Sequence, residues 1–548
     1  MSTDDTFDVI VVGGGHNGLV AAGLLARRGA RVTVLERRAN VGGAAITEQP
    51  WGSAFKMSAL SYVVSLIPAT IVRELELARH GYKIYPQNGY FVPYADGRSL
   101  QLPDDTRRRH AEISKFSGAD ADAYERWDAW LGRLAKVLGP LLETVPPRLG
   151  SLRPHDLLDQ GRLAWTLRRL GVAGVGDVTR LFTSSIADLL DEWFSSSQMQ
   201  GVLSVSGVIG TWAGPRSPGT AYVMAHHKIG DADADHADAK NSSGGQSGTW
   251  GFPEGGMGAV SNALRDAALA NGAVVRTEAP VARIDTRNGR VVGVTLESGE
   301  ELRADIVIAA THPKITFLDQ IDRAALPTDF VEAIERWKSR SGTVKVNLAV
   351  DRLPEFTAKP GFDPEVHGGT IVLAESLDDV EHAFQDAVGG RAAGLPFADI
   401  CIPSVFDPTL APEGQHVVSM FTQWVPHQWA SAKNTDELES YADRVVARVN
   451  AVAPGFTDSI LRRQVIGPYE MEHEYGLIGG NIFHGELSPD QLFHMRPAPG
   501  YADFRTPIAG LYQASSATHG GGGVTGIPGL NATQQIMRDR ARKRWRRA

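Results

Sequence analysis

The feature that most constrains this chain is a glycine-rich loop that follows its first run of β-branched residues. Residues 7–12 read FDVIVV, the loop GGGHNG comes next, and residues 19–28 have the composition of a helix that ends at Gly29. A second strand is expected at 31–36, which completes a β-α-β unit, the smallest piece of a doubly wound parallel sheet. The sequence therefore predicts an α/β fold that begins with a Rossmann-type domain.

The loop has the spacing of a dinucleotide-binding turn. Gly13 permits the tight turn, Gly15 lets a diphosphate approach the backbone, and Gly18 lets the helix pack closely on the strand. The phosphates are then expected at a helix N-terminus, where the dipole favours anions. Glu36 is suited to bind two ribose hydroxyls and would repel a 2′-phosphate, so the sequence favours FAD or NAD over NADP.

Two adjacent glycines and a single cysteine narrow the chemistry further. Gly42 and Gly43 would let the chain lie flat against the remainder of a long cofactor, which an NAD site does not need; an ordinary turn is the alternative. Cys401 is the only cysteine, which excludes an internal disulfide, a dithiol redox relay and a cysteine-ligated zinc or iron–sulfur site. No metal site is predicted.

The rest of the chain predicts a second domain inserted into the first. Helical periodicity dominates the segment that starts at residue 105, strand patterns return at 273–310, and a glycine run at 520–523 precedes a final helix. The acidic stretch 231–249 is predicted to be a surface loop. We expect an FAD-binding domain from residues 1–104, 250–330 and 481–548, and a substrate domain of mixed sheet and helices from residues 105–249 and 331–480.

Charge is distributed unevenly along the chain. The net charge of the chain is −8. Residues 538–548 alone contribute +6, so the remaining residues carry −14. A body this acidic is not expected to bind nucleic acid. The stretch from Arg538 to Arg547 suggests peripheral membrane contact, with a solvated end as the alternative. The N-terminal residues lack the pattern of a signal or transit peptide, so a cytoplasmic location is expected.

Four stretches of the chain resemble one known family. They lie at 13–48, 250–264, 481–493 and 510–533, and the family is that of the FAD-dependent phytoene desaturase-like flavoproteins, relatives of the amine oxidases. Within it the chain is most similar to the branch of the pyridine nucleotide-disulfide oxidoreductase domain-containing proteins and the long carotenoid ketolases. Ala44 stands where many members of the wider family carry an arginine, so their mechanisms are not carried over.

The resemblance implies an FAD site residue by residue. Its members include the glycines of the loop, which would hold the diphosphate, Glu36 on the adenosine ribose and Arg37 along the adenine. Backbone N–H groups near the glycine run would face the pyrimidine edge of the flavin and favour its reduction. The implied cofactor-binding residues are Gly13, Gly15, Gly18, Glu36, Arg37, Gly42, Gly43, Ala44, Val281, Ala310, Thr311, Gly522, Gly523, Val524 and Thr525.

Two residues are candidates for proton transfer. Glu254 would be a general base if burial raised its pKa; a helix cap or a salt-bridge partner is the alternative. His519, beside the glycine run, would face the flavin; a structural histidine is the alternative. No Ser-His-Asp constellation or nucleophile elbow is visible, which disfavours hydrolysis.

Together these features predict an FAD-dependent oxidoreductase of the dehydrogenase or desaturase type. Its substrate is expected to be apolar, of the prenyl, polyene or lipid class, and to lose hydride to flavin N5, after which oxygen or a quinone accepts the electrons. Three alternatives stay open: ketolase-like oxidation of a carotenoid, a redox-neutral isomerisation that uses the same flavin, and a non-catalytic protein stabilised by FAD.

Overall fold

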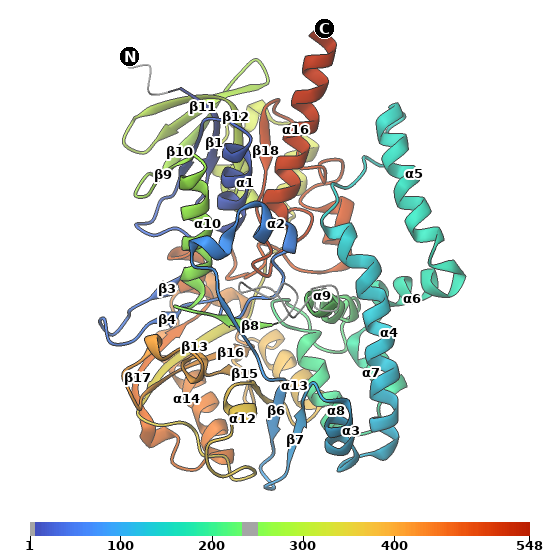
Figure 1. Cartoon of the computed structure of the whole chain (residues 1–548), viewed down its shortest axis with the longest axis vertical. Helices are drawn as coiled ribbons and strands as arrows, with labels where there is room; N and C mark the ends of the chain where they lie inside the picture. Colours follow the sequence, from blue (N-terminus) through green and yellow to red (C-terminus); the bar gives the residue numbers. More distant parts are fainter. Residues whose placement is uncertain (1–5, 233–249, 548) are drawn as a thin grey trace.

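Two β-sheets organise the described part of the chain, residues 6–232 and 250–547 of a computed structural model. In Figure 1 the first sheet lies in the upper lobe and the second in the lower lobe, with long helices along one side of both. The side chains of residues 155, 230–232 and 542–547 are not described. From residue 233 on, the predicted acidic loop lies outside the described residues.

The first sheet contains the predicted β-α-β unit. Its strand order is β10-β11-β12-β1-β2-β9, and β18 pairs with β12. The pairs β12-β1, β1-β2, β2-β9 and β12-β18 are parallel, whereas β10-β11 and β11-β12 are antiparallel. The strands are β1 (Thr6–Val12), β2 (Val32–Leu35), β9 (Val274–Arg276), β10 (Val281–Arg287), β11 (Arg290–Leu296), β12 (Glu301–Ala309) and β18 (Leu511–Gln513).

Both faces of the first sheet are buried. Along β1, Val9 and Val11 join the apolar cluster under α1, α10 and α16, while Ile10 and Val12 join a cluster on the opposite face. A strand that is apolar on both sides is typical of a parallel sheet covered on both faces. The arrangement confirms the predicted α/β fold with a Rossmann-type domain.

The second sheet is mostly antiparallel and has the order β17-β13-β16-β15-β14-β6-β7. Its strands are β6 (Tyr90–Pro93), β7 (Ser99–Leu102), β13 (Thr343–Val350), β14 (Thr370–Leu373), β15 (Phe397–Cys401), β16 (His416–Gln423) and β17 (Ile460–Ile466). Two short ribbons lie between the lobes: β3 (Thr47–Glu48) with β4 (Met57–Ser58), and β5 (Ile84–Pro86) with β8 (Gly251–Pro253).

The predicted domain boundary at residue 104 is wrong for one hairpin. The strands β6 and β7 fall inside the segment 1–104, yet β6 pairs in parallel with β14 through Tyr90 and Thr370. This pairing joins residues almost 300 positions apart, so no local pattern in the sequence reports it. The hairpin therefore belongs to the second sheet.

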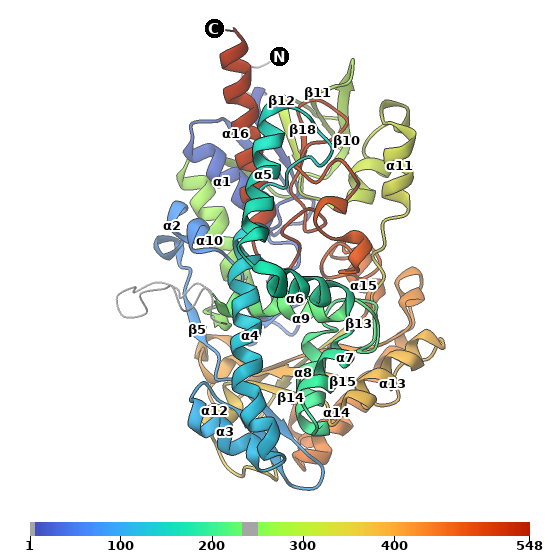
Figure 2. The same ribbon diagram turned by 90° about the vertical axis from the view of Figure 1, so that its right-hand side faces the viewer.

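Helices predominate between residues 106 and 232. Figure 2 shows α4 running from the bottom to the middle of the molecule, and α5 above it beside α16. The helices are α1 (His16–Arg27), α2 (Ala69–Glu74), α3 (Thr106–Ser114), α4 (Gly118–Leu142), α5 (Pro154–Arg168), α6 (Gly171–Thr183), α7 (Ile186–Trp193), α8 (Ser197–Ser206), α9 (Thr220–Ala232), α10 (Met257–Ala270), α11 (Thr328–Glu335), α12 (Pro364–His367), α13 (Leu377–Val388), α14 (Thr435–Val452), α15 (Pro468–His473) and α16 (Ile527–Arg547).

Candidate active site

A cavity of about 490 Å³ is lined by residues from both sheets. Gly13, Glu36 and Ala310, which follow the parallel strands β1, β2 and β12, contribute to one part of its wall. Lys345 on β13 and Asp399 on β15 contribute to another part. Ligands of open α/β sheets bind at the carboxyl ends of the strands, so the cavity lies where a dinucleotide is expected.

Gly15 and Gly18 of the loop have different surroundings. Gly15 is extended, with φ −68° and ψ 165°, and no atom lies within 4 Å of the Cβ that a side chain would add there. Such a Cβ on Gly18 would come 2.3 Å from the Gly13 carbonyl oxygen. Gly15 therefore leaves room at the cavity wall, whereas Gly18 serves the packing of α1 on the loop.

The Glu36 carboxylate fixes the loop as well as lining the cavity. Its Oε2 accepts a hydrogen bond from the Gly14 N–H at 2.8 Å, and its Oε1 accepts one from the Arg38 N–H at 2.9 Å. The residue is buried but borders the cavity. The acid is thus held at the end of β2, where it can accept hydrogen bonds from ribose hydroxyls.

The double glycine passes directly beside the loop. The Gly42 N–H donates to the Gly14 carbonyl oxygen at 2.9 Å, and Gly42 has φ +127°. A Cβ on Gly42 would lie 2.5 Å from the Ala45 carbonyl oxygen, so only glycine fits this turn. Gly42, Gly43 and Ala44 all line the cavity.

The structure brings twelve of the fifteen predicted cofactor residues to this cavity. The three others are buried beside it: Gly18 in α1, Gly522 against Phe483, and Thr525, whose Oγ1 accepts the Ile527 N–H at the start of α16. The twelve that line it are Gly13, Gly15, Glu36, Arg37, Gly42, Gly43, Ala44, Val281, Ala310, Thr311, Gly523 and Val524.

These residues fit FAD. The open space at Gly15 lies at the N-terminus of α1, whose free N–H groups favour a diphosphate. Glu36 offers its carboxylate on one side of that loop, and Gly43 and Val524 border the cavity elsewhere. One continuous cavity thus joins a nucleotide-binding wall to the glycine run near the C-terminus, a span that suits an extended dinucleotide.

The role predicted for Glu254 is wrong. Its side chain is 40% exposed, lies outside the cavity, and accepts hydrogen bonds from Lys83 Nζ and from the Tyr85 hydroxyl. These two hydrogen bonds lower the pKa of Glu254, whereas a general base would need a raised one. The pairing of β5 with β8 brings Lys83 and Tyr85 to the acid, which is a salt-bridge partner.

Replacing Glu254 by glutamine is therefore expected to leave flavin reduction by substrate within about twofold of the wild-type rate, because an exposed ion pair contributes little. Stopped-flow absorbance under anaerobic conditions measures this rate. A rate at least tenfold below that of the wild type would show that Glu254 takes part in the reaction.

His519 also lies away from the cavity. Its Nε2 is 2.9 Å from the Leu141 carbonyl oxygen at the end of α4, and its ring is buried. Burial lowers the pKa of His519 to about 4, so the ring is neutral at pH 7. The arrangement favours the alternative of a structural histidine, because His519 ties the glycine run to α4 and does not line the cavity.

A polar group on the second sheet was not predicted from the sequence. Lys345 on β13 pairs with Phe421 on β16, and Phe421 pairs with Asp399 on β15. The Lys345 Nζ donates to Ser419 Oγ at 2.6 Å and lies 4.1 Å from the centroid of the Tyr62 ring. Lys345, Asp399, Tyr62 and Phe421 all line the cavity.

Burial perturbs this group strongly. It lowers the pKa of Lys345 to about 7 and raises the pKa of Asp399 to about 6. The pKa of Tyr62 is raised, first by burial and then by Asp399. Among the described residues Asp399 Oδ1 has no hydrogen-bond partner. Groups that titrate near neutral pH at a cavity wall are candidates for proton transfer.

The sequence contains a pattern that could have identified Lys345 and Asp399 as unusual residues. Lys345 interrupts the apolar run TVKVNLAV, and Asp399 interrupts FADIC. A charged residue within a strand that is apolar on both sides is rare unless it has a partner or a function. The sequence pattern does not say which strands meet, so it cannot place the two side chains in one site.

The described residues contain no metal site and no membrane-spanning helix. Among them, no three His, Cys, Asp or Glu side chains come close enough to hold a metal ion. None of their helices combines the length and the apolarity that crossing a bilayer requires.

Comparisons with known proteins agree with this geometry. A family model for flavin-containing amine oxidoreductases matches residues 18–529. The chain is 40% identical to pyridine nucleotide-disulfide oxidoreductase domain-containing protein 2 of Rattus norvegicus, over 97% of this chain and 94% of the relative. It is 25% identical to a subunit of limonene dehydrogenase from Castellaniella defragrans, covering 100% and 97%, and 24% identical to phytoene desaturase of Phycomyces blakesleeanus, covering 97% and 84%.

Solved structures share the fold. Cyclohexylamine oxidase from Brevibacterium oxydans superposes with a TM-score of 0.56 at 18% identity, covering 97% of this chain and 99% of the other. An oxidoreductase from Methanosarcina mazei gives a TM-score of 0.57 at 17% identity, covering 97% and 99%. The predicted amine-oxidase-like architecture is therefore confirmed.

Proposed function

Since the chain belongs to the family of flavin-containing amine oxidoreductases, we propose that it dehydrogenates an apolar substrate of the prenyl, polyene or lipid class. Membership confirms the predicted FAD cofactor, the enzyme class of FAD-dependent oxidoreductase and the resemblance to phytoene desaturase-like flavoproteins. The substrate class and the reaction are our proposal.

The observation that carries the proposal is the lining of the cavity away from the glycine loop. Apolar and aromatic side chains lie there around the polar group of Lys345 and Asp399, and such side chains provide contacts for a hydrocarbon chain. Limonene and phytoene, after which two relatives are named, are hydrocarbons of this kind. The apolar and aromatic lining residues are Tyr90, Ile209, Trp250, Phe421, Ile482 and Phe483.

Lys345 is the residue proposed to accept the proton. When bound in this cavity, FAD would supply a two-electron acceptor for the hydride that the substrate loses. Lys345 holds its amine in the cavity wall with Ser419 as a hydrogen-bond acceptor, and about half of it is neutral near pH 7. The neutral amine can take a proton from the carbon next to the one oxidised, which leaves a double bond. Phe421 and Tyr62 line the cavity beside it, where their rings would exclude water.

The test is anaerobic mixing of the FAD-loaded protein with fractions of cellular lipids. We expect one fraction to bleach the flavin absorbance, and oxygen or a quinone to restore it with formation of a desaturated product. Turnover without consumption of an oxidant would support the isomerase instead, and an oxygenated carotenoid the ketolase. Absence of bleaching with every fraction would support the non-catalytic protein and overturn the proposal.

We further propose that the enzyme is cytoplasmic and contacts a membrane peripherally through Arg538 to Arg547. The support is the basic composition of this stretch, set against the acidic remainder of the chain. The stretch continues α16 without a break in the helix.

A further inference from the structure

Exposed apolar side chains concentrate on one short part of the molecule. Of thirteen large hydrophobic side chains that are exposed among the described residues, seven lie between residues 149 and 175, on α5, α6 and the loop before α5. Leu152 is 84% exposed, Trp165 63% and Val172 93%. A cluster of this kind marks an interaction site. We call it the apolar ridge; it comprises Leu149, Leu152, Leu157, Leu158, Trp165, Val172 and Val175.

The ridge follows one face of α5. With 3.6 residues per turn, Leu157, Leu158, Gly161 and Trp165 fall on one side of the helix, and all four are exposed. Leu163 and Leu167, on the other side, are only partly exposed. The helix thus turns an apolar stripe away from the protein, the reverse of a surface helix that packs on a core.

Arginines lie at one edge of the stripe and at its C-terminal end, whereas Asp156 and Asp159 are on the opposite side of α5. Arg162, Arg168 and Arg169 are exposed, and the Arg168 guanidinium lies 5.9 Å from the centroid of the Trp165 ring. Asp156 accepts a hydrogen bond from Ser151 Oγ at 2.6 Å. Residues 148–180 contain six arginines and three aspartates, so this segment is basic within an acidic chain.

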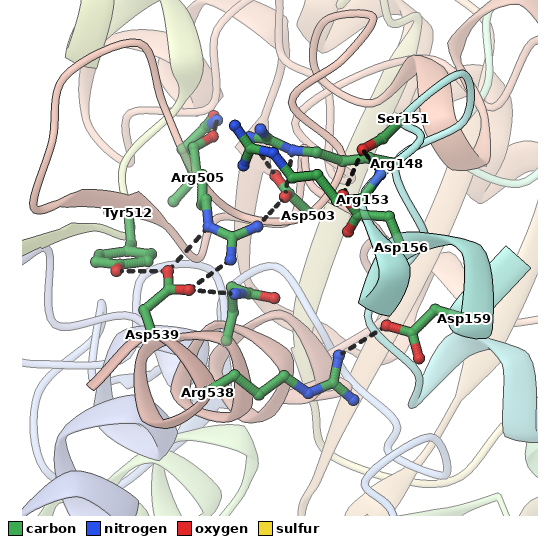
Figure 3. Close-up of polar contacts among 12 residues, drawn as sticks. Arg148, Ser151, Arg153, Asp156, Asp159, Asp503, Arg505, Tyr512, Arg538 and Asp539 are labelled. Atoms are coloured by element: carbon green, nitrogen blue, oxygen red, sulfur yellow. Dashed lines mark hydrogen bonds and ion pairs between the residues drawn. The ribbon is translucent and has the colours of Figure 1, made fainter. Parts of the chain in front are cut away.

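The inner side of α5 is tied to α16, the helix that carries the basic C-terminal stretch. Figure 3 shows Asp159 on α5 reaching Arg538 on α16, an ion pair of 4.0 Å. The loop before α5 is held by Arg148, whose Nε donates to Asp503 Oδ2 at 2.7 Å. Arg505 in turn joins Asp503 to Asp539 of α16. These contacts hold α5 beside the start of the basic stretch, with the apolar ridge on the opposite side of α5.

We propose that the apolar ridge inserts into the interfacial region of an anionic lipid bilayer, with the flanking arginines on the lipid phosphates. Leucine and tryptophan on one face and arginine at its edges are the composition of helices that lie in the membrane interface. A second copy of this chain fits less well, because a two-fold interface would bring the same basic segment of both copies together, with six arginines and three aspartates from each. The acidic remainder of the chain is repelled by the bilayer, which leaves the ridge as the side that approaches.

The test is flotation of the full-length FAD-loaded protein with vesicles of phosphatidylcholine and phosphatidylglycerol. The wild type is expected to float with these vesicles, and vesicles of phosphatidylcholine alone to retain much less of it. The variant L158E/W165E is expected to lose about tenfold or more in vesicle affinity, because two interfacial side chains become charged. Both residues are exposed, so the variant is expected to fold; its flavin spectrum and thermal unfolding check this.

A control variant introduces a glutamate at an exposed aromatic residue outside the apolar ridge. Phe362 is 65% exposed, close to the value for Trp165, and lies far from α5 in the second lobe, so F362E is expected to float like the wild type. The proposal fails if the wild type does not float, or if L158E/W165E floats as well as the wild type. It also fails if F362E loses as much vesicle affinity as L158E/W165E. A dimer in gel filtration that only L158E/W165E dissociates, without vesicle binding by the wild type, would assign the ridge to a second copy. Vesicle flotation does not require turnover, so its result is independent of the flavin-bleaching experiment, which tests the proposed reaction.

Discussion

Replacing Gly15 by valine should give a folded protein that no longer retains FAD. The backbone of Gly15 has φ and ψ values that valine readily adopts, and nothing in the protein lies within 4 Å of the added Cβ. The new side chain would therefore occupy the space that the diphosphate needs. We expect the affinity for FAD to fall by at least about 100-fold, which corresponds to about 2.7 kcal/mol.

Gly18 provides the contrast. A Cβ there meets the Gly13 carbonyl oxygen at 2.3 Å, so G18V is expected to destabilise the protein itself by about 3 kcal/mol or more. Flavin content after gel filtration, and thermal unfolding of each variant beside FAD-free wild type, separate the two cases. Normal flavin content in G15V would refute the placement of the diphosphate, and an unfolded G15V would show that Gly15 serves the fold.

Replacing Lys345 by methionine should slow flavin reduction by substrate about 100-fold, the lower end of the contribution of a general base. Methionine fills a similar volume and is uncharged, so the buried site keeps its packing. In our proposal the base is the neutral amine of Lys345, which forms as the pH rises. The rate is therefore expected to increase with pH through the pKa of Lys345, about 7, and to level off at higher pH, where the amine is fully neutral.

Rapid mixing at a series of pH values, under anaerobic conditions, measures both effects. K345M should lack the rise near pH 7. Lys83 lies outside the cavity in an exposed ion pair with Glu254, so K83M should keep the wild-type rate and pH profile. If K345M retains the same pH-dependent rise, another group is the base.

Local spacing predicted the nucleotide half of the site. Gly13, Gly15 and Glu36 lie within 24 residues of one another, and a β-α-β unit brings such positions together whatever the rest of the chain does. Ala310 and Val524 came from family resemblance rather than from spacing. In each of these cases the structure has the residue at the cavity.

The substrate half could not be predicted in the same way. Lys345 and Asp399 lie on either side of Phe421 only because β16 is between their strands, and strand order in an antiparallel sheet is set by contacts far apart in the sequence. The same limitation explains the error at Glu254. Its neighbours depend on the ribbon of β5 and β8, which joins residues 84–86 to 251–253, and without that pairing its exposure was unknown.

The two halves of the cavity stand on different sheets, and this has an evolutionary consequence. The first sheet provides Gly15, Glu36 and Ala310, while the second provides Lys345 and Asp399. Substitutions on the second sheet can therefore alter the substrate without changing the cofactor site, so the two properties are free to diverge under separate selection. Relatives named for limonene and for phytoene, each matched along most of this chain, are compatible with such a history.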